Sequence, residues 1–322
     1  MRVLSSLAVV ALTLGTLGTQ AQFRTRVDLV RLDVGVTDDD GHVGGLTAAD
    51  FVVEDLGALQ SVTVEEMRDT ALDLVVVAPP LSAVHYVAGD QVHRVGSGVE
   101  AFFSLVEARD RLAVVLASPP PRLLRPLEPG PPPFALQPFT ADERFYSAPF
   151  DAIAMGLSLF SSSERRPVLV AFTNAADFRS VLAPGTVAQL VGRLGPSFVV
   201  VGMPVSLRLS GEAWNELRDG RQVGDVIEST VSSRLLSDAL VQFVRRSGGQ
   251  LVNLADEHPR QLMTDLVTSL RSRYVLTYPL PKGAGRHDVR VRVKRRGLKI
   301  SVRDGYFVDD AATVQTSSSS RY

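Results

Sequence analysis

The first part of the chain alternates between hydrophobic and polar residues with a period of two. Hydrophobic residues from Val30 to Val36 occupy every second position, and charged residues such as Arg31 and Asp33 lie between them. This period is typical of a half-buried β-strand. Residues 47–50 then predict a short capped turn that leads into a second strand at 51–54. This part of the chain therefore predicts a small β-rich unit without a long helix of its own.

The pattern changes after Asp73, where short hydrophobic runs follow one another without polar interruption. Such runs are typical of strands that are buried on both faces of a parallel sheet. Helical stretches separate them, and strands that alternate with helices predict right-handed βαβ crossovers. The predicted fold class is therefore α/β, with a doubly wound, mostly parallel, Rossmann-like sheet. The predicted strands are Leu74–Val77, Leu112–Leu116, Val168–Phe172, Phe198–Val201 and the shorter Leu251–Leu254, and the predicted helices include Gly98–Ala108, Phe150–Phe160 and Arg234–Arg246.

Alternation returns after Arg273, for example at Tyr274, Leu276 and Tyr278. Two β-rich ends around an α/β core predict that the ends pair into one small, discontinuous β-domain, of the β-sandwich kind, with the α/β domain inserted in it. The proline-rich stretch Pro119–Pro133 predicts an extended surface loop, and residues 204–232 form a polar insertion. The predicted division is 1–21 signal peptide, 22–70 plus 271–309 β-domain, 71–270 α/β domain and 310–322 disordered tail.

Composition and the start of the chain limit the possible partners and compartment. The formal net charge is −1 and there are no cysteines, so we expect neither nucleic-acid binding nor a thiolate metal site. Val3–Leu17 is hydrophobic and Thr19-Gln20-Ala21 fits a cleavage site, which predicts a signal peptide; an uncleaved N-terminal helix is the alternative. We therefore expect a periplasmic or secreted protein, with no stable membrane insertion after signal cleavage.

Three short segments resemble a known family. They are Gly45–Asp55, which follows Val27–Val30, then Ser272–Tyr278, and Asp304–Phe307, which follows Val291–Lys299. These segments are similar to signatures of secreted bacterial proteins with a von Willebrand factor A-related domain, and the similarity spans about residues 26–308. The resemblance implies that the α/β domain has the von Willebrand factor A (vWA) fold. It also implies a metal-ion-dependent adhesion site, in which an Asp-x-Ser-x-Ser loop, a threonine and a further aspartate hold a Mg²⁺-type ion.

The residues at the corresponding positions here are poor ligands for such an ion. The loop has Ala78 in place of the aspartate and Pro80 in place of the first serine, and only Ser82 remains; the threonine position falls near Ser147 and the last aspartate on Asn174. A divalent cation needs anionic oxygens to offset its dehydration. We therefore predict a degenerate site without metal, and a weak Mg²⁺ site built from the remaining hydroxyls, the amide and water is the alternative.

Other candidate chemistry is weak. Gly96–Ala101 matches a loose dinucleotide-binding pattern, but it is far from the preceding strand, so it predicts a helix entry and no nucleotide site. Asp38-Asp39-Asp40 is interpreted as a solvated turn. The histidines are dispersed and no G-x-S-x-G motif is present, so we predict neither a cofactor nor an enzyme.

We therefore predict an exported, non-enzymatic protein-interaction module, adhesion- or scaffold-like, that binds a protein partner without a divalent metal. Ligands of an open α/β sheet bind at the carboxyl ends of its strands. One alternative is a structural assembly subunit that pairs through a β-domain edge, and another is an enzyme that uses Asp151 and Asp177. The predicted partner-binding face comprises Ala78, Pro80, Ser82, Ser147, Asp151, Asn174 and Asp177.

Overall fold

The computed structural model describes residues 28–38, 41–80, 89–133, 147–161, 165–173, 177, 179–195, 197–202, 239–254 and 258–309. Its central six-stranded sheet has the order β10-β9-β8-β5-β6-β7. All neighbouring strands are parallel except β6 and β7. This confirms the predicted doubly wound, mostly parallel α/β class. The strands are β5 (Leu72–Ala78), β6 (Arg111–Leu116), β7 (Arg122–Pro129), β8 (Arg166–Thr173), β9 (Ser197–Gly202) and β10 (Gln250–Asn253).

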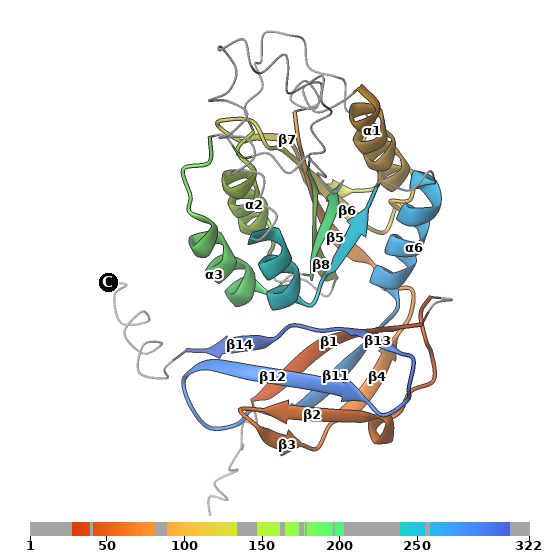
Figure 1. The fold of residues 1–322 in the computed structure, drawn as a ribbon, viewed down its shortest axis with the longest axis vertical. Helices are drawn as coiled ribbons and strands as arrows, with labels where there is room; N and C mark the ends of the chain where they lie inside the picture. Colours follow the sequence, from red (N-terminus) through yellow and green to blue (C-terminus); the bar gives the residue numbers. More distant parts are fainter. Residues whose placement is uncertain are drawn as a thin grey trace, which may run out of the picture.

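Helices cover both faces of this sheet (Figure 1). Helices α1 (Gly89–Phe103) and α6 (Pro259–Arg271) pack on one face, and α2 (Pro149–Ser158), α3 (Pro184–Leu194) and a helical segment at 239–247 pack on the other. Strand β5 is buried along its whole length, with Leu74 and Val76 in one core cluster and Val75 and Val77 in the other. An uninterrupted hydrophobic strand is what a sheet covered on both faces requires.

Two elements differ from the expectation. Strand β7 occupies much of the proline-rich stretch that the sequence predicted as a loop, and it pairs antiparallel with β6 at the edge of the sheet. Proline lacks an amide proton, but an edge strand needs donors on one side only, so Pro126 is tolerated there. Helix α1 begins at Gly89 and ends at Phe103, so Gly96–Ala101 lies inside the helix and does not open it.

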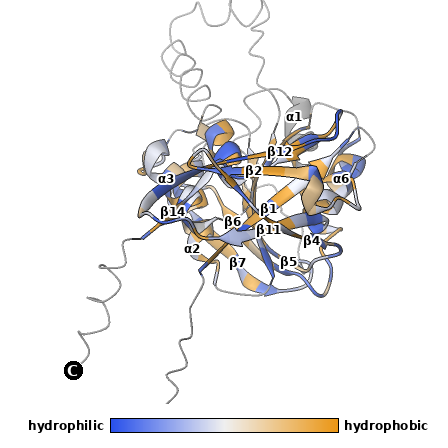
Figure 2. Cartoon of the chain, turned by 90° about the horizontal axis from the view of Figure 1, so that it is seen from below, coloured by the Kyte–Doolittle hydropathy of each residue, from blue (hydrophilic) through white to orange (hydrophobic). Residues whose placement is uncertain are grey.

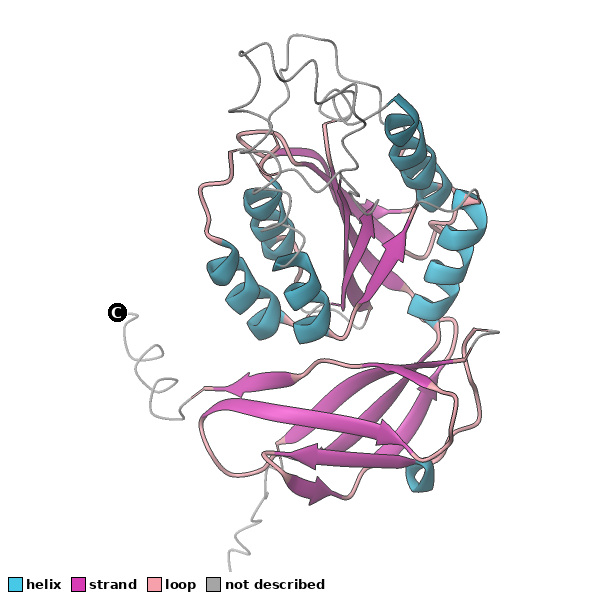
Figure 3. Cartoon of the chain, viewed as in Figure 1, coloured by secondary structure: helices cyan, strands magenta, loops and turns pink. Residues whose placement is uncertain are grey.

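A second unit, here called the β-unit, consists of two four-stranded antiparallel sheets with the orders β13-β1-β11-β4 and β14-β12-β2-β3. Strand β1 pairs with β11 and β2 pairs with β12, so the two ends of the chain build both sheets together, as predicted. Among the described residues of the β-unit, one short helix occurs, η1 (Ala48–Asp50), at the capped turn. Figure 3 shows the β-unit below the α/β unit, and Figure 2 shows hydrophobic colour along strands such as β1 and β2. The strands are β1 (Leu29–Thr37), β2 (Phe51–Asp55), β3 (Ala58–Gln60), β4 (Thr63–Met67), β11 (Arg273–Pro279), β12 (Gly285–Val293), β13 (Lys299–Ser301) and β14 (Gly305–Val308).

The core of the β-unit contains a buried polar cluster around Asp55. Tyr278 and Tyr306 donate their hydroxyls to Asp55 Oδ2 at 2.8 and 2.6 Å, and His287 Nδ1 lies 2.9 Å from Asp55 Oδ1. His287 Nε2 faces the carbonyl of Gly283 at 3.2 Å. Burial, together with the nearby carboxylate, raises the pKa of both tyrosines. Each side chain of this cluster therefore has a hydrogen-bond partner. This is the condition under which a buried polar cluster stabilises a core.

Ion pairs join the β-unit to the α/β unit. Asp33 of β1 lies between Arg166 of β8 and Arg273 of β11, at 2.6 and 3.0 Å. Arg273 also donates to the carbonyl of Gly248, at 3.2 Å, in the turn before β10. Burial lowers the pKa of Arg166 to about 10, and the charge of Asp33 offsets part of that effect. Because Arg166 lies at the start of β8, the β-unit is attached at the amino ends of the central strands, opposite their carboxyl ends (Figure 1).

Within the described residues, no helix is long and hydrophobic enough to cross a membrane. The predicted signal peptide (1–21), the predicted tail (310–322), the insertion at 204–232 and part of the aspartate turn (39–40) lie outside the described residues.

Candidate partner-binding face

The carboxyl ends of β5 and β6 are joined to the start of α2 by backbone hydrogen bonds. Ala117 donates its amide to the carbonyl of Ala78 at 2.8 Å, and Ala148 donates to the carbonyl of Ala117 at 2.9 Å. Ala78, Pro80 and Ser147 are buried. Three of the predicted face residues therefore lie close together, but beneath the surface.

Asp151, in the first turn of α2, holds the segment 179–183 that leads into α3. Its carboxylate accepts hydrogen bonds from the amides of Val181, at 2.9 and 3.1 Å, and Leu182, at 2.8 Å. A carboxylate in the first turn of a helix is also favoured by the helix dipole. Asp151 thus fixes the position of two backbone amides.

A second set of hydrogen bonds fixes the same loop. Asp177 Oδ1 accepts from the amide of Ser180 at 3.1 Å, and Ser180 Oγ accepts from the amide of Phe150 at 3.1 Å. Phe150 is one of the first residues of α2, whose amides have no partner within the helix. Arg179 donates its amide to the carbonyl of Ser147 at 3.2 Å. The structure therefore brings Ser147, Asp151 and Asp177 together around one loop.

This loop presents a hydrophobic side chain to solvent. Val181 is 91% exposed, although its amide is held by Asp151. The sequence pattern does not single out Val181 or Ser180. The signal for them was the proline at Pro184, the first residue of α3, which indicates a loop ending there. Nothing in the sequence indicates that Asp151 reaches this loop.

The described residues of this face do not fit a divalent cation. Ala78 offers a methyl group and Pro80 an aliphatic ring, and the carboxylate of Asp151 already accepts two amides. A cation at Asp151 would have to displace those amides, and the carboxylate of Asp177 likewise already accepts the amide of Ser180. Ser82 and Asn174 lie outside the described residues.

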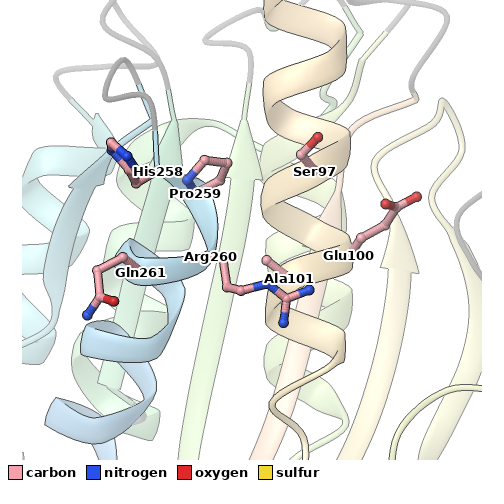
Figure 4. A pocket seen from close by; sticks show the side chains of 7 residues that line it. All are labelled: Ser97, Glu100, Ala101, His258, Pro259, Arg260 and Gln261. Carbon is pink, nitrogen blue, oxygen red and sulfur yellow. The ribbon is translucent and has the colours of Figure 1, made fainter.

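A separate open pocket, with a volume of about 570 Å³, lies between α1 and α6 (Figure 4). Ser97, Glu100 and Ala101 line it from α1, and residues 258–261 line it from the start of α6. The glycine motif of the sequence borders this pocket, but Gly98 faces inward, where an added Cβ would lie 3.2 Å from Leu254 Cδ1. Gly98 therefore serves close packing of α1 against the end of β10, and phosphate binding at a helix start would need a different position.

Neither a family model nor a curated protein sequence matches the chain. Among solved structures, proximal thread matrix protein 1 from the mussel byssus, with a zinc-occupied MIDAS motif, is similar with 12% identity and a TM-score of 0.44; the match covers 68% of this chain and 50% of that one. The ArnB paralog VWA2 from Sulfolobus acidocaldarius is similar with 10% identity and a TM-score of 0.39, covering 89% and 78%. BatB from Bacteroides thetaiotaomicron is similar with 10% identity and a TM-score of 0.39, and the match covers 62% of this chain and 99% of that one. The chain thus spans about half the length of the mussel protein, and these low scores carry no conclusion about activity.

Proposed function

We propose that the protein is an exported, non-enzymatic interaction module, adhesion- or scaffold-like, that binds a protein partner at the carboxyl ends of its central strands without a divalent metal. The observation that carries this proposal is the loop segment 179–183, where Asp151 and Asp177 accept hydrogen bonds from backbone amides and Val181 is exposed. A hydrophobic side chain on a preordered loop loses little conformational entropy when a partner covers it.

The position of this loop supports the proposal. It lies at the end of the α/β unit that the β-unit leaves free (Figure 1). In open α/β sheets this end is the place where ligands bind. The α/β unit thus offers a binding face at one end and a rigid attachment at the other.

The chemistry of the face supports binding without metal. An adhesion site bridges to the carboxylate of a partner through its cation. Here the carboxylate of Asp151 is committed to Val181 and Leu182, and buried Ala78 and Pro80 have no oxygen ligand in their side chains. We therefore propose that the partner contacts Val181 and its surroundings directly.

The test replaces an exposed hydrophobic residue with aspartate at the proposed face and, as a control, at a second site in the β-unit. Tagged wild type, Val181→Asp and the control Leu59→Asp are used to capture partners from the native cell envelope, with and without EDTA. Leu59 is also hydrophobic and 74% exposed, but it lies on β3 in the β-unit. We expect one partner to be captured equally in EDTA, to be lost with Val181→Asp and to be retained with Leu59→Asp.

A second candidate function is pairing through an edge of the β-unit. Strand β3 is an edge strand; its Leu59 is 74% exposed, and Leu56 in the turn before it is 55% exposed. Exposed edge strands can accept a strand from another chain. Loss of capture with Leu59→Asp but not with Val181→Asp would favour this function, and loss of capture in EDTA would contradict metal-free binding.

A further inference from the structure

We infer that a pocket between α3 and the β12–β14 pair is a binding site for an oxyanion, a carboxylate or phosphate group. The pocket has a volume of about 350 Å³ and is lined by Gln189, Arg193, Arg246, Arg286 and Phe307. Three of these five residues are arginines and none is acidic, in a chain whose net charge is −1. This concentration of positive charge is therefore local.

Elements of both units bring the arginines together. Gln189 and Arg193 are four residues apart on α3 and thus share a face of the helix. Arg246 belongs to the helical segment at 239–247, and Arg286 of β12 lies directly opposite Phe307 of β14 in the sheet. The pocket consequently exists only when the β-unit is packed against the α/β unit.

Phe307 orients two of the guanidinium groups. The guanidinium carbon of Arg193 lies 5.4 Å from the centre of the Phe307 ring, and that of Arg286 lies 6.0 Å from it. A guanidinium that rests on an aromatic face keeps its N–H groups at its edge, where they can donate to an oxyanion. The aromatic ring therefore positions donors without neutralising their charge.

Within the described residues, two carboxylates lie at the pocket's arginines, and both pair with Arg286. Arg286 donates to Asp288 at 2.7 Å and to Asp304 at 2.9 Å. Within the described part of the chain, no carboxylate pairs with Arg193 or Arg246. Like charges that converge on one pocket repel one another, and a bound oxyanion would relieve that repulsion by accepting bidentate hydrogen bonds.

Arg193 and Arg246 also have a purely structural explanation, which the experiment must distinguish from anion binding. Arg193 lies in the last turn of α3, and Arg246 lies near the end of the helical segment at 239–247. Cations are favoured at helix carboxyl ends. That role predicts an effect of substitution on stability but none on anion binding.

The experiment is calorimetric titration of the full mature chain with inorganic phosphate, and separately with a short glutamate-rich peptide, at low ionic strength. We expect saturable binding that Arg193→Gln and Arg246→Gln each weaken by about tenfold, the loss of one charge-assisted pair. Arg193→Lys, which keeps the charge but not the planar group, should fall between. The control Arg290→Gln removes an arginine of β12 whose side chain is 72% exposed and does not line the pocket, and its affinity should equal that of the wild type.

The two titrants separate the sources of the oxyanion. Binding of phosphate alone indicates a small free anion, and displacement of phosphate by the peptide indicates an acidic polypeptide segment; both support the site. Absence of saturable binding to either titrant overturns the inference. It is also overturned if Arg193→Gln and Arg246→Gln lower the melting temperature but bind phosphate as the wild type does.

Discussion

Single buried residues in this protein show how a charge can be kept inside a fold. Asp110 is fully buried, and Arg271 donates to both of its oxygens, at 3.0 and 2.6 Å, while the amides of Leu72 and Glu107 each donate at 2.9 Å. Burial alone would raise the pKa of Asp110, but these donors outweigh it and hold the pKa below its ordinary value. Removing Asp110 or Arg271 alone would leave an uncompensated buried charge, so the two residues stabilise the fold only together.

We predict that Asp110 contributes to acid unfolding. The pKa of Asp110 is lower in the folded state than in the unfolded state. Its contribution to the free energy of unfolding is therefore complete above the unfolded-state pKa of about 3.9, and it is lost as pH falls through the folded-state pKa. At pH 7, Asp110→Asn should lower the free energy of unfolding by about 3 kcal/mol, since Arg271 loses its buried ionic partner and keeps only the more exposed Glu107 at 3.3 Å. Urea unfolding from pH 7 to 3 should show the variant and wild type converging below pH 4. The control Asp288→Asn, 74% exposed, should run parallel to the wild type.

At the scale of the element, loops take their shape from side chains that belong to neighbouring helices. The segment 179–183 before α3 is held by Asp151 of α2 and by Asp177. Secondary-structure propensity could not have predicted the contact between Asp151 and Val181, because the two residues are thirty positions apart in the chain. Side chains from outside the segment therefore help to hold the exposed Val181 in one conformation.

We predict that Asp151→Asn loosens this loop without unfolding the protein. The amide of asparagine accepts fewer hydrogen bonds than a carboxylate and carries no charge, so the free energy of unfolding should fall by about 1.5 kcal/mol. Hydrogen exchange should accelerate at the amides of Val181 and Leu182. The control Asp265→Asn, on the exposed face of α6 where Gln261 donates to it, should leave these rates unchanged. Unchanged exchange in Asp151→Asn would contradict the role assigned to this carboxylate.

At the scale of the whole molecule, close backbone packing reinforces the ion pairs between the two units. Gly248 has a φ of +66°, and a Cβ there would lie 2.4 Å from the backbone of Val302 and Arg303. Arg273 donates to the carbonyl of the same glycine. The two units are therefore joined by close backbone contact at Gly248 and by the ion pairs of Asp33 with Arg166 and Arg273. We expect them to unfold together.

We predict that Gly248→Ala separates the two units. The left-handed backbone alone costs about 1 to 2 kcal/mol for alanine, and the added methyl cannot fit without moving β13 and its flanking residues. Thermal unfolding should change from one transition to two. The matched control is Gly192→Ala in α3, where an added Cβ meets nothing within 4 Å, and it should raise stability by up to about 1 kcal/mol. A single, unshifted transition in Gly248→Ala would disprove the coupling.

The sequence by itself determined the class of fold and the pairing of the chain ends, because burial on one face or on two leaves a period along the strand. Strand β5 was predicted by its uninterrupted hydrophobic run and β1 by its alternation. For the candidate face the sequence allowed a prediction only: it included Ala78 and Pro80, and both side chains are buried.

Only the tertiary structure decided what these residues contact. It made β7 an edge strand despite its prolines, because pairing on one side requires half of the backbone donors. It directed Asp151 to the amides of a distant loop and brought Arg193, Arg246 and Arg286 into one pocket from separate elements. Contacts between residues far apart in the chain depend on the path of the backbone, and hydrophobic periodicity contains no information about that path beyond the nearest turn of helix or step of strand.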